Sequence, residues 1–150
     1  EKRMKPLPKS DWAHLIPHQG GMCLLDCVIE WSDQRIHART DSHRSTDNPL
    51  RSDGILRAVH LCEYGAQSMA VHGALLARAQ GQRAAPGFLV SLRAVKLGLV
   101  RIDDLDGSLD VFGERLLGGE SSWQYAFRIE HAGNEIASGR AAVMLNPGSS

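Results

Sequence analysis

The alternation of hydrophobic and polar residues predicts two strands, then one long helix, then about four more strands. The first strands are predicted where Leu, Val and Ile gather, at residues 22–31 and 35–40. The most apolar stretch follows at residues 54–79. It contains no proline, so we predict a long helix from Ile55 to about Ala79. Later strands are expected at residues 87–102, 109–117, 122–131 and 135–145.

The order of these elements predicts the fold class. A single helix that is apolar on nearly all sides needs cover on nearly all sides, and a curved antiparallel sheet provides it. We therefore expect an α+β fold in which a sheet of about six strands wraps one long central helix. Residues 1–9 are expected to be a disordered tail, and residues 10–150 a single domain.

Composition and charge exclude several classes of protein. The chain has 17 basic and 17 acidic residues and zero net charge, which argues against nucleic-acid binding because that needs clustered basic charge. No run approaches 18 consecutive apolar residues and no signal-peptide pattern opens the chain, so we expect a cytoplasmic protein without a membrane span. The cysteines have no CxxC spacing and are expected to be reduced thiols: Cys23, Cys27 and Cys62.

A narrow polar stripe crosses the predicted helix. His60, Glu63 and Gln67 are spaced three and four residues apart, which places them on one helix face. The stripe is either the solvent edge of the helix, a buried network that pairs with itself, or a catalytic face lining a pocket. A carboxylate buried in such a helix needs a partner or takes a raised pKa, and both are properties of a catalytic acid.

The same helix carries two further signals. His60 and Glu63 have the spacing of half a metal motif, but a carboxylate-bridged site needs more inward ligands on other helices, so no metal is expected. Gly65, Ala66 and Ala70 allow another backbone to approach closely. That backbone is either a second helix in a dimer or the sheet.

Several segments resemble the hotdog-fold dehydratases that act on 3-hydroxyacyl groups carried on acyl carrier protein. The resemblance rests on the opening Leu15-Ile16-Pro17-His18, on the strand entry Met22-Cys23-Leu24-Leu25-Asp26, and on the helix motif Leu61-Cys62-Glu63-Tyr64-Gly65-Ala66-Gln67. A divergent branch, the dehydratase-like proteins of aryl polyene pigment clusters, is more closely similar. It shares the pattern from His18 to Asp26, then Asn48-Pro49-Leu50, Asp53-Gly54 and Glu63-Tyr64-x-Ala66-Gln67.

The resemblance implies an activity and partners. The reaction would be dehydration of a 3-hydroxyacyl thioester to a trans-2-enoyl thioester in fatty-acid or polyene-type biosynthesis. The implied partners are acyl carrier protein and a second hotdog subunit, in a homodimer or a heterodimer, and no cofactor is implied. Glu63 would be the catalytic acid, and the Ala58 amide would donate to the enolate oxygen. The substrate-binding residues would also include Pro17, Gln67 and His60.

The chain departs from the family at one position. The family's catalytic histidine stands 14 residues before the helix carboxylate, and here that residue is Pro49. His18, in the Pro-His position, and His43, in the long polar loop at residues 41–54, are the candidates to replace it, and His18 is preferred. The open alternatives are a hotdog subunit of little or no activity that scaffolds an active dehydratase, an acyl thioesterase that uses Glu63 to activate water, and a carrier of hydrophobic ligands.

Overall fold

The long helix, α1 (Leu61–Ala79), is shorter than predicted at its start. The computed structural model describes residues 6–82, 87–118 and 122–145. A single 3-10 turn at Ala58–His60 leads into α1, and the preceding residues are extended, not helical. They are held so by a later segment, because Arg57 forms a β-bridge with Arg101 and the carboxylate of Asp103 accepts a hydrogen bond from the Leu56 amide at 3.0 Å.

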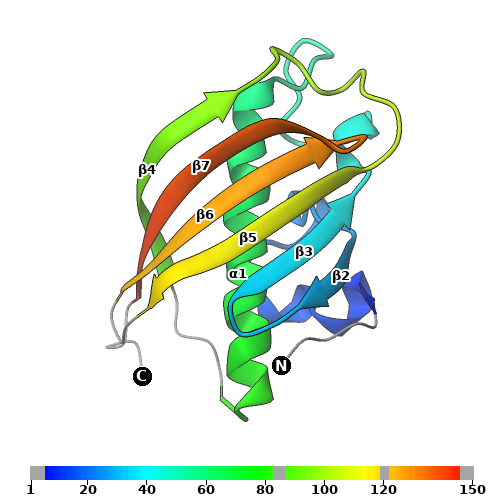
Figure 1. Cartoon of the computed structure of the whole chain (residues 1–150). Coiled ribbons are helices and arrows are strands. Elements are labelled where there is room, and N and C mark those ends of the chain that lie inside the picture. Colours follow the sequence, from blue (N-terminus) through cyan, green and yellow to red (C-terminus); the bar gives the residue numbers. More distant parts are fainter. Residues whose placement is uncertain (1–5, 83–86, 119–121, 146–150) are drawn as a thin grey trace.

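The predicted curved sheet is confirmed, with seven antiparallel strands in the order β1-β2-β3-β5-β6-β7-β4. Figure 1 shows the sheet curving around α1, which runs along its concave side. The strands are β1 (Leu7–Pro8), β2 (Cys27–Trp31), β3 (Arg35–Thr40), β4 (Gly87–Leu97), β5 (Leu109–Gly118), β6 (Ser122–His131) and β7 (Asn134–Leu145).

Three boundaries differ from the prediction. Residues 22–26 are not part of β2, because Gly20–Met22 form a 3-10 turn and the chain then runs along α1. Strand β4 ends at Leu97, five residues before the predicted end at residue 102. The expected disordered tail is partly ordered: Leu7–Pro8 pair with β2 as β1, and residues 1–5 lie outside the described residues.

The core lies between α1 and the concave face of the sheet, in two clusters. The larger contains Leu61, Tyr64 and Leu75 of the helix, and the smaller contains Met69, Tyr125 and Phe127. Alternate residues of β6 point inward, since Tyr125, Phe127 and Ile129 are all buried. A large inward row on β6 therefore packs directly against the helix.

The Phe127 ring lies between two glycines. A Cβ added to Gly65 of α1 would stand 2.6 Å from the ring, and one added to Gly139 of β7 would stand 2.8 Å from it. Real Cβ atoms do not approach other atoms so closely, so both positions need glycine while the ring keeps its place. The Phe127 ring therefore sets how closely α1 packs against the sheet at this point.

Among the residues that the structure describes, one side of the molecule is uncovered. Strand β4 is at the end of the sheet and pairs only with β7, so its other edge is open among the described residues. Its inward side chains lie opposite buried or inward residues of β7, yet they are between 38% and 47% exposed. We call this set the open face: Leu89, Leu92, Val95 and Leu97.

Candidate active site

Glu63 lies in the first turn of α1, and its side chain is exposed. Of the three interpretations of the polar stripe, the solvent edge describes Glu63 in the isolated chain. The nearby helix residues Tyr64, Ser68 and Val71 are buried, whereas the Glu63 carboxylate is open to solvent.

Gln67, one turn after Glu63, is buried and anchors a distant segment to the helix. Its side-chain oxygen accepts a hydrogen bond from the Leu24 amide at 2.8 Å, and its nitrogen donates to the Met22 carbonyl. Residues spaced by four lie one turn apart on a helix, so residues 22–24 are held against α1 one turn after Glu63. The amide of Gln67, expected to bind substrate, is thus already bonded to the main chain.

His18 is half-buried in the loop between the 3-10 turns Ala13–Leu15 and Gly20–Met22. Its Nδ1 atom is buried and has no hydrogen-bond partner among the described residues. The same loop contacts Pro49, since a Cβ added to Gly21 would stand 3.8 Å from the proline ring. The His18 loop thus adjoins the position where the resembled family has its histidine, and Pro17 in it is exposed.

His43, the second candidate base, is fully buried. Its Nε2–H donates to the Leu105 carbonyl at 3.0 Å, while Nδ1 has no partner among the described residues. Burial lowers the pKa of His43, because the charged imidazolium is poorly solvated there. The ring is therefore neutral at pH 7 and enclosed by protein, whereas Glu63 is open to solvent.

Tyr64 organises the long polar loop, a role that was not predicted from the sequence. Its hydroxyl lies 3.0 Å from Ser42 Oγ and accepts a hydrogen bond from Asn48 Nδ2 at 3.1 Å. Asn48 also accepts from the Leu50 amide at 2.9 Å, which fixes the turn around Pro49. Burial raises the pKa of Tyr64, so the hydroxyl stays protonated and available to the network. The sequence signal for this role was the occurrence of Asn48-Pro49 and Tyr64 in the same family pattern.

The two predicted residues before the helix are differently placed. The Ala58 amide donates to the Val100 carbonyl at 2.8 Å, so that N–H is occupied in this structure, and a role as enolate donor would require Val100 to release it. His60 is the residue immediately before α1 and is half-buried. The main chain of Val100 therefore covers the Ala58 amide just before the first turn of α1.

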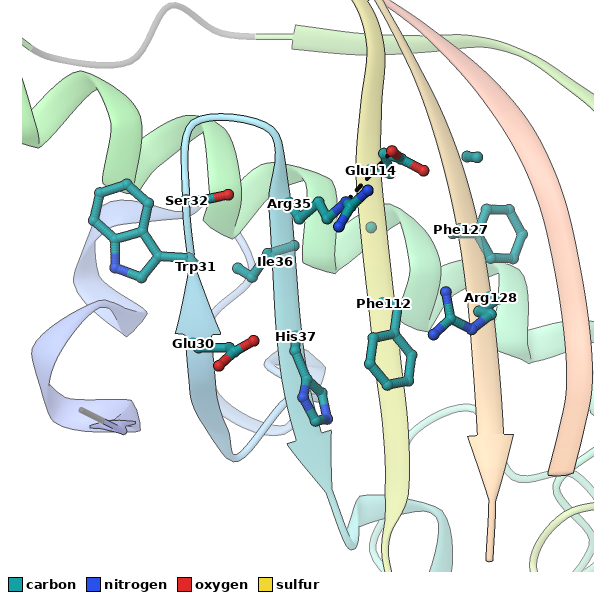
Figure 2. A pocket seen from close by; sticks show the side chains of 12 residues that line it. Glu30, Trp31, Ser32, Arg35, Ile36, His37, Phe112, Glu114, Phe127 and Arg128 are labelled. Carbon is teal, nitrogen blue, oxygen red and sulfur yellow. Dashed lines mark hydrogen bonds and ion pairs between the residues drawn. The ribbon is translucent and has the colours of Figure 1, made fainter. Parts of the chain in front are cut away.

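A depression of about 630 Å³ lies away from these residues, on the outer face of the sheet. Figure 2 shows the outward side chains of β3, β5 and β6 around it. The Phe112 ring stacks on His37 at 4.2 Å on one side and meets the Arg128 guanidinium at 4.0 Å on the other. The depression contains none of the predicted site residues, and the ring at its centre is occupied on both faces.

Two negative findings concern the described residues alone. No group of three or more His, Cys, Asp or Glu side chains in residues 6–82, 87–118 and 122–145 could hold a metal ion. Within the same ranges, no helix has the length and hydrophobicity that a membrane span needs.

One long helix inside an antiparallel sheet, with an acid in its first turn, defines a hotdog-fold protein. A family model described as ApeP-like, ApeP dehydratase, matches residues 10–149. The chain therefore belongs to the ApeP-like dehydratase family.

Comparison with solved structures agrees. The dehydratase heterocomplex ApeI:P from Xenorhabdus doucetiae matches with 25% identity and a TM-score of 0.81, over 93% of this chain and 91% of that one. A hypothetical thioesterase from Streptococcus pneumoniae matches with 13% identity and a TM-score of 0.58, over 79% and 84%. A Staphylococcus aureus thioesterase matches with 15% identity and a TM-score of 0.56, over 88% and 92%. The thioesterase likenesses show the fold alone. No curated protein matches the chain in sequence.

Proposed function

We propose that this chain removes water from a 3-hydroxyacyl thioester on acyl carrier protein, giving a trans-2-enoyl thioester in polyene or fatty-acid-type biosynthesis in the cytoplasm. Membership of a dehydratase family supports the reaction class. The observation that carries the assignment of residues is the Gln67 anchor, which holds the segment after His18 against α1 one turn from Glu63.

The proposed chemistry divides between His18 and Glu63. The thioester acidifies the proton at C2, and the His18 imidazole takes it as general base. The bond from C3 to the hydroxyl oxygen then breaks, and Glu63 gives that oxygen a proton, directly or through a water, so that water leaves. The electron pair of the C2–H bond forms the new double bond. His18 and Glu63 return to their starting states by exchanging one proton through solvent.

His18 is preferred to His43 on accessibility. A general base must come within hydrogen-bond reach of the proton it removes. The His43 ring is fully buried and its N–H is held by Leu105, whereas His18 is half-buried in the loop beside Pro49. His43 is assigned to the stability of the polar loop.

The site is completed by a second hotdog subunit. Glu63 is exposed and the open face is apolar, so the isolated chain neither encloses a reacting group nor walls in an acyl chain. A subunit packed on this side would do both. The similar ApeI:P structure is a dehydratase heterocomplex, which supports a partner of the same fold.

A scaffold of low activity is the second candidate. Pro49 stands where the resembled family has its histidine, and the Ala58 N–H is bonded to Val100. In this version the chain would enclose the site of an active partner and supply no catalytic group itself.

The test measures turnover of 3-hydroxyacyl carrier protein by mass spectrometry, with the chain in complex with its partner subunit. Glu63→Gln and His18→Gln should each lower kcat by about 100-fold or more, the usual worth of a general acid or base. His14→Gln is the matched control, because His14 is an exposed histidine in the preceding 3-10 turn and should leave the rate unchanged.

Other outcomes assign the function differently. Full turnover by Glu63→Gln in an intact complex would establish the scaffold. Loss of turnover in His43→Gln but not in His18→Gln, with both variants folded, would move the base to His43. Release of the free hydroxy acid with no enoyl product would make the chain a thioesterase.

A further inference from the structure

A group of cations lies on the outer face of the sheet at its open edge. Arg140 of β7 points outward, because its neighbours Gly139 and Ala141 are buried against the core. Arg93 of β4 stands directly opposite Arg140 in the antiparallel register, and Lys96 stands opposite Ser138. A bulge between Arg93 and Lys96 keeps both on the outer face.

These cations are not neutralised. Among the described residues, none of the three forms an ion pair, and Arg93 reaches only the amide oxygen of Gln124 at 3.4 Å. Other outer-face arginines each contact a carboxylate, in the pairs Arg35–Glu114, Arg39–Asp110 and Arg128–Glu130. The contrast is local to the edge strands, in a chain whose net charge is zero. We call Arg93, Lys96 and Arg140 the basic edge.

The basic edge makes pairing with a second copy unfavourable. If the β4 strands of two copies joined side by side, the sheets would continue and the inner apolar residues would be covered. The same step would bring two basic edges together within a few strand spacings of about 4.8 Å. Like charges that face each other across strands are destabilising, and the described outer-face residues at this edge offer no carboxylate between them.

We propose that the basic edge selects a different hotdog subunit, one whose own edge strand carries carboxylates on its outer face. This selection rests on the proposed assembly with a second hotdog subunit. It adds which surface of the chain binds that subunit and which charge the subunit carries there. Burial of the apolar open face stabilises the complex. The basic edge makes the complex specific, because it repels a second copy. Complementary charge would then turn the repulsive arrangement into cross-strand ion pairs.

Sedimentation velocity on the isolated chain tests the repulsion. Self-association should be weak at about 50 mM salt and should strengthen at about 500 mM, because salt screens like charges. The neutral variant Arg93→Ser/Lys96→Ser/Arg140→Ser should self-associate about tenfold or more tightly at low salt. Arg35→Ser is the matched control, since it removes an outer-face arginine three strands from β7 and should change nothing.

Mixing tests the selection directly. An acidic variant, Arg93→Glu/Lys96→Glu, should pair with the unaltered chain at low salt more tightly than either pairs with itself. Wild-type self-association that equals that of the neutral variant at low salt, or that weakens with salt, would overturn the proposal, as would a mixture without preference. These readouts measure association only, so they stand apart from any failure of the dehydratase assay.

Discussion

His72 links three parts of the fold through one buried ring. Its Nε2–H donates to the Ser32 carbonyl at 2.7 Å, and its Nδ1 lies 2.8 Å from the Tyr125 hydroxyl, which donates to it. Burial lowers the pKa of His72 to about 4, because the imidazolium would lose its hydration and one of these two bonds. The neutral ring is therefore part of the folded state.

Stability should fall as the pH drops from 6.5 to about 4. The pKa of His72 is lower in the folded state than in the unfolded state, so the unfolded state binds more protons in this window. The stabilisation is fully present above pH 6.5, is lost as the pH falls to about 4, and amounts to about 3 kcal/mol. Denaturant unfolding at several pH values measures it.

His72→Gln is the informative variant for this prediction, because glutamine cannot titrate but can hydrogen-bond. Its unfolding free energy should vary less with pH in this window than that of the unaltered chain. His43 has a lowered pKa of the same sign and should supply the remaining slope. An unchanged slope in His72→Gln would contradict the assignment.

The sequence shows where the polar residues of α1 lie on the helix, but not which of them are buried. Glu63, Gln67 and His72 all interrupt an apolar helix, but only the last two are buried. The helical period shows which residues share a face, yet the curvature of the sheet decides which face is covered. The sequence therefore identified Glu63 as a candidate but left open whether its carboxylate is buried or at the solvent edge, and the structure shows it exposed.

At the level of elements, strands with clear alternation were predicted with their ends. The predictions for β3 and β6 agree with the structure at both boundaries. Predictions failed where apolar residues serve another purpose. Leu24 and Leu25 are apolar because they are buried in the core, and the main chain of Val100 and Ile102 bonds to the segment before α1 instead of continuing β4. Hydrophobicity alone does not separate these uses from a strand.

The interlock of Phe127 with two glycines should be sensitive to a single methyl group. Gly65→Ala should lower the unfolding free energy by about 1–3 kcal/mol, because the added Cβ would overlap the ring. The loss should shrink in Gly65→Ala/Phe127→Leu relative to Phe127→Leu alone, as a double-mutant cycle would show. Gly73→Ala is the matched control, since its Cβ would stand 3.6 Å from Trp123 in ordinary contact.

At the level of the whole molecule, the fold class followed from the order of elements, but the assembly did not. The sequence does not reveal that β4 is the last strand of the sheet, because β4 does not pair with β5, the strand that follows it in the chain. The cations of β4 can be assigned to one basic surface with Arg140 only when the register of β4 with β7 is known. The proposed completion of the site by a second subunit likewise could not be inferred from any one segment, because it rests on the exposure of Glu63 and of the open face in the folded chain.

The open face should matter for assembly and little for the single chain. Leu92→Ser/Leu97→Ser should change the unfolding free energy of the isolated chain by about 1 kcal/mol or less, because both side chains are already more than a third exposed. The same change should weaken association with the partner subunit by about tenfold or more, since it removes apolar area from the interface. Calorimetry of the complex compares the two effects, and equal losses in both would argue against the interface.

The unpaired edge of β4 also has a consequence for the living cell. A free strand edge with apolar neighbours is a template on which other chains can add and aggregate. In the proposed assembly the second subunit covers this edge, so the time before it binds sets how long the edge stays exposed. In that assembly, chains made in excess of the second subunit would become substrates for chaperones and proteases. The basic edge, by repelling other copies, lengthens the time in which a correct meeting can occur.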